Sequence, residues 1–507
     1  MSYHLVWFKR DLRVHDHAAL WHASRQAPVL CLYIIEPSLW QAADASTQHY
    51  QFLRESLLDL DRALRKRGGG LRIEVGEVVD VLDRIWHEAP FAALYSHQET
   101  GNWLSFQRDL AVQRWCRKRG LPWHEFAQFG VVRRLPSRNH WQAHWEALMA
   151  APCLEVPGCR WISAPSPLML PEPQSFSLKQ ADPPQRQRGG RRPAIATLRD
   201  FLFERSGRYR GGISSPLSAP SACSRLSAYL AFGCLSLREV VQASRRQIDA
   251  LPTCDARRAG LTAFVSRLYW HCHFIQKLES EPELEFRNMH RGYDGLREAD
   301  WNPAHFQALS EGRSGWSLVD ACVAMLNRTG WLNFRMRAML VSVAAYPLWL
   351  HWQPVGTWLA RQFLDYEPGI HWSQMQMQAG TTGINATRVY NPIKQARDHD
   401  PRGHFVRHWL PALSRVPQEW LFEPWRMPTK LQQQCGVKVG VDIPEPPVDL
   451  ETATRQAKAR LYAIRSQPEV KAAKAASVEK HGSRKRPMPR RPAKPIAGAW
   501  VQTELEC

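Results

Sequence analysis

The chain has 507 residues and a formal net charge of +20, which favours a polyanionic partner, nucleic acid before a membrane surface. Its length predicts two or three domains with ample hydrophobic core. No apolar run is long enough to cross a membrane and the first residues do not resemble a signal peptide, so we expect neither a transmembrane segment nor a leader.

Short apolar runs alternate with helical patterns from residue 3 to about residue 128. Leu53, Leu57, Leu60 and Leu64 form the apolar stripe of one such helix. There is no G-x-G-x-x-G motif, and the three glycines at 68–70 are predicted to end that helix rather than to bind phosphate. The alternation predicts a Rossmann-like α/β domain over residues 1–130, with a parallel sheet and right-handed crossovers. The predicted strands are residues 5–8, 29–35, 71–75, 92–96 and 123–126.

The rest of the chain changes character twice. Residues 131–195 are rich in proline and include a polar, basic stretch at 185–192, which predicts a linker. An almost unbroken helical pattern over residues 196–435 predicts an all-α domain. Prolines at 444, 446 and 447 mark a further boundary, and residues 451–507 carry 13 Lys/Arg against 5 Asp/Glu. We predict that residues 436–507 form a disordered basic extension, which either attaches to DNA without sequence preference or has no partner.

Residues 365–392 have an unusual composition for a soluble protein. Asp365 and Glu367 stand beside Pro368, and an uncharged run rich in Gln, Thr, Met and Gly follows as far as Arg388. Such amides and hydroxyls suit a pocket for a flat ligand with polar edges, because they offer donors and acceptors without buried charge. Arg337 lies upstream and could pair with Asp365. A loop between two core helices, with surface arginines, is the alternative.

Several ordered segments resemble the photolyase/cryptochrome family. Residues 331–337, 365–377 and 390–392 resemble its flavin-binding core, and residues 4–13, 223–233, 302–304, 315–321 and 404–411 resemble further family segments in the family's order. The resemblance covers most of residues 3–430. It implies an FAD cofactor in the helical domain, a folate or deazaflavin antenna in the α/β domain, and a monomer that binds UV-damaged DNA.

The resemblance assigns the FAD phosphates to the turn that opens a helix near residue 227. Hydroxyls and free backbone N–H groups at a helix start suit a pyrophosphate, although ordinary N-capping is the alternative. Cys223 stands where the family usually has Thr, which removes one hydroxyl. The candidates are Cys223, Ser224, Arg225, Leu226 and Ser227, with Tyr209 from the same pocket wall.

The candidates for the flavin ring follow from the same resemblance. Arg337 and Asp365 resemble an ion pair beside the ring, for which a structural buried salt bridge is the alternative. Tyr366 adjoins this pair, and Glu367 stands where the family usually has Asp. His371 falls at the position that faces the flavin N5, where photolyases usually have Asn. A histidine there could donate a hydrogen bond or a proton to the flavin, or be a neutral pocket histidine.

The sequence matches the family at the flavin-binding positions but departs from it at the lesion-binding positions. Trp270 matches a tryptophan that stacks on the DNA lesion. Arg267 replaces a lesion-binding Glu, Phe334 replaces Asn, and Met377 replaces a second stacking Trp. Asn333 and Phe334 also replace the two histidines of the (6-4) repair branch. The DNA-contacting candidates are Arg267, Trp270, Phe334, Arg335 and Gln395, and the catalytic candidates are Trp270, Arg335 and His371.

The family's chain of three tryptophans, which carries electrons to the flavin, is also altered. Its first position is Met375, and a thioether cannot relay a radical as an indole does. Trp352 matches the second position, while the third is Ala299, with Trp301 two residues away. We therefore expect that photoreduction of the flavin takes another path, with Trp352 and Trp301 as the candidates.

The cysteines and histidines do not predict a metal site. The three side chains of the His271–His273 run point about 100° apart on a helix, so they cannot easily bind one ion. The 11 cysteines include no C-x-x-C pair, and only Cys435 and Cys507 lie in the last third of the chain. This pattern argues against an iron–sulfur cluster and favours reduced thiols, hence a cytoplasmic protein.

The resemblance implies an enzyme like deoxyribodipyrimidine photolyase, in which light-excited reduced FAD passes an electron to a pyrimidine lesion drawn out of the duplex. A cryptochrome-type blue-light photoreceptor that has lost repair activity is the alternative. A flavoprotein that binds nucleic acid without light-dependent chemistry is a third possibility.

Overall fold

A computed structural model of the chain describes residues 2–156, 158–165, 168–178, 180–385 and 388–483. Its first part is a parallel five-stranded sheet in the order β3-β2-β1-β4-β5. The strands are β1 (His4–Phe8), β2 (Val29–Ile35), β3 (Leu71–Val75), β4 (Ala93–His97) and β5 (Trp123–Phe126). The predicted α/β domain is confirmed, and every predicted strand lies within one residue of the observed one.

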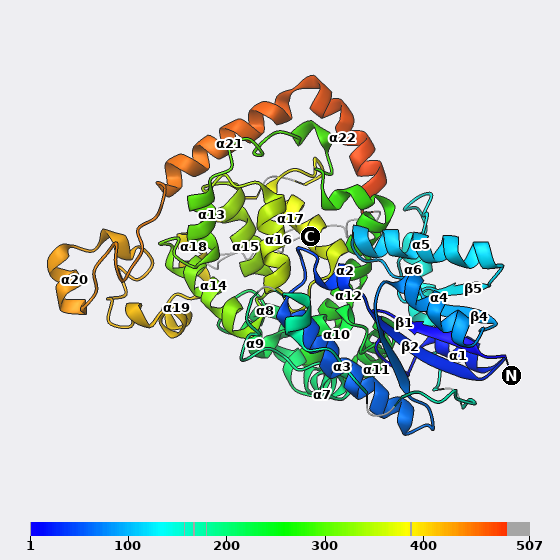
Figure 1. The fold of residues 1–507 in the computed structure, drawn as a ribbon. Coiled ribbons are helices and arrows are strands. Elements are labelled where there is room, and N and C mark those ends of the chain that lie inside the picture. Colours follow the sequence, from blue (N-terminus) through cyan, green and yellow to red (C-terminus); the bar gives the residue numbers. More distant parts are fainter. Residues whose placement is uncertain (1, 157, 166–167, 179, 386–387, 484–507) are drawn as a thin grey trace.

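Helices cover both faces of this sheet (Figure 1). Val6 and Phe8 of β1 belong to the core beneath α1 (Ala18–Ser24) and α3 (Thr47–Arg65). Leu5 and Trp7 belong to the core beneath α4 (Val78–Glu88) and α5 (Trp103–Arg119). Successive side chains of a strand point to opposite faces, so a central strand buried on both faces reads as a continuous apolar run.

The second part is helical from α7 (Arg191–Phe203) onward. The helices that build its centre are α10 (Ser227–Ala231), α12 (Ala256–Ser280), α14 (Ser317–Thr329), α15 (Phe334–Ala345), α16 (Trp352–Gln362), α17 (Pro368–Ala379) and α18 (Pro392–His399). The predicted all-α domain is therefore confirmed. The preceding segment, predicted as a linker, contains α6 (Trp141–Ala150). No described helix is both long and apolar enough to cross a membrane.

Helix α17 (Pro368–Ala379) carries the first part of the unusual stretch at 365–392, and it crosses α12 closely. Pro368 occupies the first turn of α17, and Gly380 ends the helix with φ of +80°, a left-handed conformation that favours glycine. A Cβ on Gly369 would lie 2.6 Å from the Cα of Ile275 in α12. The crossing thus depends on a glycine at this position.

We expect Gly369→Ala to lower the free energy of unfolding by about 1–3 kcal/mol, because the added methyl would press the α17 and α12 backbones apart. Gly158, around which an added Cβ would meet no atom within 4 Å, supplies the control Gly158→Ala. Urea unfolding of both variants measures the difference. Equal stability of the two variants would show that the crossing tolerates a side chain.

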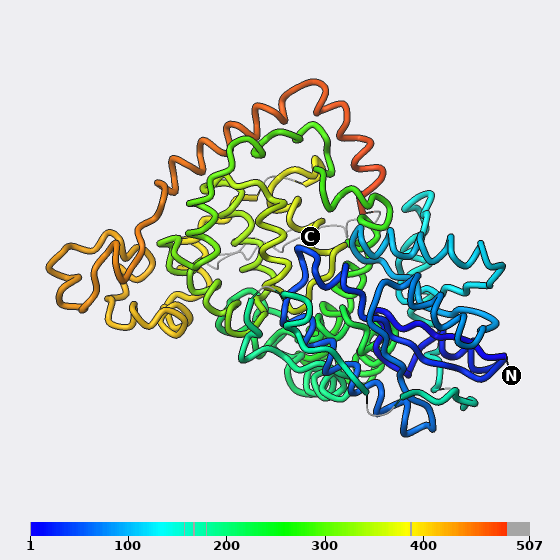
Figure 2. The backbone as a smooth tube through the Cα atoms, in the orientation of Figure 1, coloured from blue at the N-terminus to red at the C-terminus, as the bar shows by residue number. Residues whose placement is uncertain are grey.

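The extension predicted to be disordered is ordered as far as residue 481. Helices α21 (Leu450–Ser466) and α22 (Pro468–His481) run over the helical domain, and α22 ends beside the α/β domain (Figure 2). Val470 is buried, and its carbonyl accepts a hydrogen bond from His290 Nε2 at 2.9 Å. The prediction of disorder is wrong for residues 450–481, because their few apolar side chains pack on a surface built by other segments. The predicted tail from 484 to 507 lies outside the described residues.

Candidate functional site

The turn before α10 has an uncommon backbone geometry. Arg225 has φ of +62°, a left-handed conformation that non-glycine residues rarely adopt outside functional turns. Its guanidinium stacks 3.9 Å from the ring centre of Trp331 and donates to Gln187 Oε1 at 3.2 Å. Gln187 Nε2 in turn donates to the carbonyl of Arg225 at 3.0 Å. These contacts fix both the turn and the direction of its guanidinium.

Positive charge is concentrated at this turn. Arg205 donates to the carbonyl of Ser224 at 3.1 Å and also to that of Cys223. Burial lowers the pKa of Arg225 to about 10, although Asp365 opposes this effect. Within the described part of the chain, no ion pair joins Arg225 to a carboxylate. A buried cation of this kind, next to the Ser224 hydroxyl, fits a pyrophosphate.

Arg337 and Asp365 form the predicted pair. The guanidinium of Arg337 lies 2.9 Å from Asp365 Oδ1 and 3.0 Å from Oδ2, and its Nε donates to the carbonyl of Leu332 at 2.7 Å. Burial disfavours the charged carboxylate, but Arg337 and the hydroxyl of Ser227 outweigh it and hold the pKa of Asp365 below its ordinary value. The pair therefore joins α15 to the segment before α17, and the contact between Asp365 and Ser227 joins that segment to the start of α10.

Glu367 adjoins this pair at the start of α17. Its Oε2 lies 3.3 Å from a guanidinium nitrogen of Arg10, which follows β1. Burial raises the pKa of Glu367, although Arg10 opposes this effect. Glu367 Oε1 and Asn333 Oδ1 are buried and have no hydrogen-bond partner among the described residues. Two buried acceptors without a protein partner fit a ligand that carries N–H and O–H donors, as FAD does.

The environment of His371 determines its hydrogen-bonding role. Its Nε2 lies 2.9 Å from the carbonyl of Gly356, which can only accept, so Nε2 carries the proton and Nδ1 is an acceptor. Burial lowers the pKa of His371 to about 4, so the ring is neutral at pH 7. This geometry argues against the donor role that we considered from the sequence and favours the neutral pocket histidine.

Sequence reasoning missed Trp372. This indole is 2% exposed and lies between His371, at a ring-centre distance of 4.9 Å, and Trp352, at 5.9 Å. Trp301 packs instead against Phe306, at 5.2 Å. The spacing contained a signal, because positions 372 and 375 lie on one face of a helix.

The remaining candidates divide by exposure. Phe334 is 48% exposed, and Arg267 is also exposed, while Trp270 is partly buried and packs edge-on against His273 at 4.9 Å. Arg335 is partly exposed at the start of α15. Gln395 is only 8% exposed in α18, so it does not lie on the surface as a DNA contact would. Four of the five candidates for DNA contact therefore reach the surface at least in part.

The remaining candidates for the cofactor pocket are enclosed by protein. Tyr209 and Leu226 are buried, and Tyr366 donates its hydroxyl to Asp44 at 2.8 Å.

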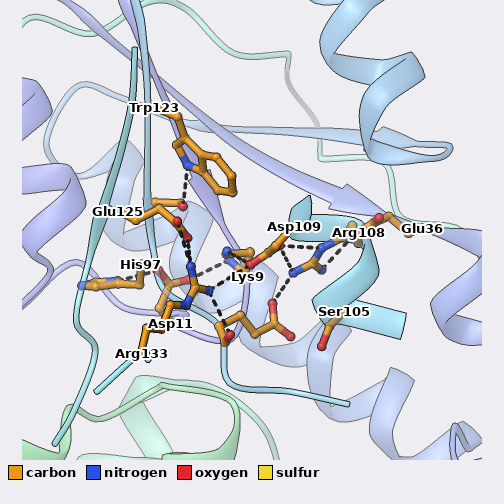
Figure 3. A network of polar contacts seen from close by, with 12 residues as sticks. Lys9, Asp11, Glu36, His97, Ser105, Arg108, Asp109, Trp123, Glu125 and Arg133 are labelled. Carbon is orange, nitrogen blue, oxygen red and sulfur yellow. Dashed lines mark hydrogen bonds and ion pairs between the residues drawn. The ribbon is translucent and has the colours of Figure 1, made fainter. Parts of the chain in front are cut away.

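A second polar site lies at the carboxyl ends of the strands (Figure 3). From β1 the chain adds β2 and β3 on one side of the sheet, and then β4 and β5 on the other side of β1. The strand order therefore reverses between β1 and β4, and open α/β sheets bind ligands at such a topological switch point. Arg108 pairs with Glu36 at 3.1 Å and with Glu99 at 2.6 Å, and Lys9 pairs with Asp109 at 3.1 Å. Burial raises the pKa of Glu36 to about 7. The adjoining cavity of about 150 Å³ is lined by Tyr33, Glu36, Trp40, Asn102, Arg108 and Tyr366, among others.

Asp11, His17 and His97 offer ligand atoms within 4.8 Å of one another in the same region. Asp11 Oδ2 lies 2.7 Å from His97 Nδ1 and 2.9 Å from His17 Nε2. His17 Nδ1 accepts the backbone N–H of Leu20 at 3.0 Å, so the proton of the neutral ring sits on Nε2, the nitrogen 2.9 Å from the carboxylate. The cluster is therefore a set of close polar contacts that orders the switch point, because the His17 nitrogen that faces Asp11 already carries a proton and offers no lone pair to a metal.

Two family matches cover most of both domains. Residues 4–133 match the family described as DNA photolyase, and residues 264–463 match the FAD binding domain of DNA photolyase. The deoxyribodipyrimidine photo-lyase of Escherichia coli (strain K12) is 31% identical over 492 residues, which cover 92% of this chain and 99% of that protein. A cryptochrome DASH of Gloeobacter violaceus is 29% identical, with 88% of this chain and 93% of that protein covered.

Solved structures share the fold. A cryptochrome of Synechocystis sp. PCC6803 superimposes with a TM-score of 0.80 at 23% identity, covering 90% of this chain and 99% of that chain. A bacterial class III photolyase from Agrobacterium tumefaciens gives a TM-score of 0.78 at 24% identity, covering 92% and 98%. An archaeal photolyase from Sulfolobus tokodaii, solved with two FAD molecules, gives 0.74 at 24% identity, covering 91% and 99%.

Proposed function

Since this chain belongs to the DNA photolyase family and carries its FAD-binding domain, we propose that it is a light-driven lyase that repairs pyrimidine lesions in UV-damaged DNA. The observation that carries the proposal is the combination of two features. A buried guanidinium cluster with the Arg337–Asp365 pair fits FAD, and an aromatic, cationic surface at Phe334 and Arg335 lies at the start of the same helix as Arg337.

The residues of the site have distinct tasks in this proposal. Arg225 and the hydroxyl of Ser224 bind the pyrophosphate of FAD, while the hydroxyl of Ser227 supports Asp365. The Arg337–Asp365 pair orients the flavin ring, and the guanidinium of Arg337 favours negative charge on the ring. Neutral His371 accepts a hydrogen bond through Nδ1 and donates no proton at pH 7. When bound, reduced and excited by light, FAD supplies the electron that opens the lesion.

The DNA side of the proposal rests on Trp270, Phe334 and Arg335. The free energy needed to draw a base out of the duplex is lowest at a damaged site, and this difference aids selectivity. Trp270 provides a ring for stacking, and Arg335 provides a cation for phosphate. The net charge of +20 supports association with DNA of any sequence. The cavity at the switch point is the place that we propose for an antenna chromophore.

A cryptochrome-type photoreceptor is the second candidate. Arg267, Phe334 and Met377 stand where photolyases bind the lesion with other side chains, which favours a loss of repair. Helix α22 is joined to α12 through Glu281, which pairs with His481 at 2.8 Å and with Lys480 at 2.7 Å. In a photoreceptor, release of this helix would be the two-state element that a partner reads.

We expect Trp270→Ala to remove the preference for damaged over intact DNA, because base stacking on an aromatic side chain is worth about 1–3 kcal/mol. The slope of log K against log salt should stay nearly unchanged, since it counts phosphates rather than stacked bases. Binding to defined lesions at several salt concentrations measures both quantities. Trp21→Ala, which removes an indole from α1 in the other domain, is the control.

Repair assays on defined pyrimidine photoproducts, with and without light, test the proposed function directly. Light-dependent reversal of a lesion by the wild-type protein supports the lyase. A wild-type protein that binds FAD, prefers no photoproduct and repairs none in light would exclude the lyase and favour the photoreceptor.

A further inference from the structure

Trp372 occupies the space beside Met375. The two residues lie three positions apart on α17 and are each 2% exposed. A Cβ on Gly356 of α16 would lie 2.5 Å from Trp372 Cζ3 and 3.3 Å from Met375 Cγ. Both side chains therefore pack against the same point of α16, and the glycine there lets the larger indole approach the helix.

Trp372 joins Trp352 to the flavin segment by direct ring contacts. Its ring centre lies 5.9 Å from that of Trp352, at an interplanar angle of 69°. On its other side it contacts His371 edge-on, at 4.9 Å. His371 in turn meets Tyr366 at 5.2 Å, next to the Asp365 that pairs with Arg337. An unbroken series of packed aromatic rings thus leads from Trp352 to the predicted flavin site.

The surroundings of Trp352 determine how it would behave when oxidised. Its indole Nε1 donates to Asn288 Oδ1 at 2.7 Å. The amide orientation is fixed, because Asn288 Nδ2 donates to Asp294 Oδ1 at 2.9 Å. A neutral amide oxygen is a poor base, so an oxidised Trp352 keeps its proton and persists as a radical cation. Trp352 is 1% exposed, which also shields such a radical from water.

We propose that Trp372 replaces the missing indole at position 375 and forms, with Trp352, the electron relay to the flavin. Trp372 gives one electron to the light-excited, oxidised isoalloxazine ring and becomes an indole radical cation. Trp352 then gives one electron to Trp372, and a thiol reductant at the protein surface returns one electron to the buried Trp352 by tunnelling. The inference rests on the proposed function, because it requires FAD in the pocket beside His371.

The test compares wild-type protein with Trp372→Phe, Trp352→Phe and the control Trp316→Phe. Trp316 is a buried indole, 1% exposed, in the same hydrophobic core. With a thiol reductant under blue light, each relay variant should lose at least about tenfold in the rate of flavin reduction. The double variant should lose little more than either single one, whereas Trp316→Phe should match the wild type.

Two further measurements do not depend on photoreduction. In the apoprotein, the edge-to-face pair should give an exciton-coupled circular dichroism signal that Trp372→Phe and Trp352→Phe both remove and Trp316→Phe keeps. The FAD released on denaturation should be equal in all four proteins. Light-induced radicals in the wild type should have the spectrum of a tryptophan radical cation rather than of a neutral tryptophan radical.

Flavin reduction in Trp372→Phe as fast as in the wild type would overturn the relay, and so would its absence in wild-type protein that holds FAD. Chemical reduction of the flavin bypasses the relay and separates this inference from the proposed function. Chemically reduced Trp372→Phe should repair lesions at the wild-type rate. If the chemically reduced wild type repairs nothing, the lyase fails, while the photoreduction rates still decide the relay.

Discussion

Purified Asp365→Ala protein should contain much less FAD than the wild type and bind it about 30-fold more weakly. Removal of the carboxylate leaves Arg337 as a second uncompensated cation beside Arg225, and breaking a buried pair costs about 3–5 kcal/mol. The side chain of Arg337 is 22% exposed, so solvent screens part of this cost. A residual of about 2 kcal/mol corresponds to FAD binding weakened about 30-fold.

The measurement is the FAD released on denaturation per mole of protein, together with a titration of the apoprotein with FAD. Asp300→Ala is the control, because Asp300 forms an exposed ion pair with Arg460 at 3.2 Å, far from the flavin segment in the sequence. Full FAD retention in Asp365→Ala would place the cofactor elsewhere.

His371→Asn should change how stability depends on pH. The folded pKa of His371 is about 4 because of burial, and the unfolded value is about 6.5. Between these values the unfolded chain binds a proton at this position and the folded protein does not. The free energy of unfolding therefore falls as the pH drops from about 6.5 to about 4, by up to about 1.4 kcal/mol per pH unit from this group.

The Asn variant lacks this proton uptake, so its stability should decrease less on acidification. Over the whole window the wild type should lose up to about 3 kcal/mol relative to the variant. Urea unfolding of both apoproteins at intervals from pH 7 to pH 4 measures the difference. His144→Asn, at an exposed position of α6, is the matched control for the loss of one histidine. Parallel profiles for His371→Asn and the wild type would contradict a buried, neutral His371.

The strands and the two-domain division were predictable from the sequence alone, because they depend on local patterns. Apolar runs such as residues 29–35 identify strands through composition and length, and the leucine stripe at 53–64 identifies α3 through its period. The pairing of Arg337 with Asp365 followed from a family resemblance that quoted those residues. The strand and helix signals lie within single segments, and the resemblance supplied the one pairing between segments, so no tertiary contact had to be known.

Only the tertiary structure decided the features that arise where remote segments meet. The carbonyl of Gly356 sets the tautomer of His371, and Gly356 also makes room for Trp372 against Trp352. The surface that orders α22 is built by residues near Glu281 and His290. Each of these depends on which side chains face one another across two helices. That choice is made by the packing of the whole core, which no pattern within one segment specifies.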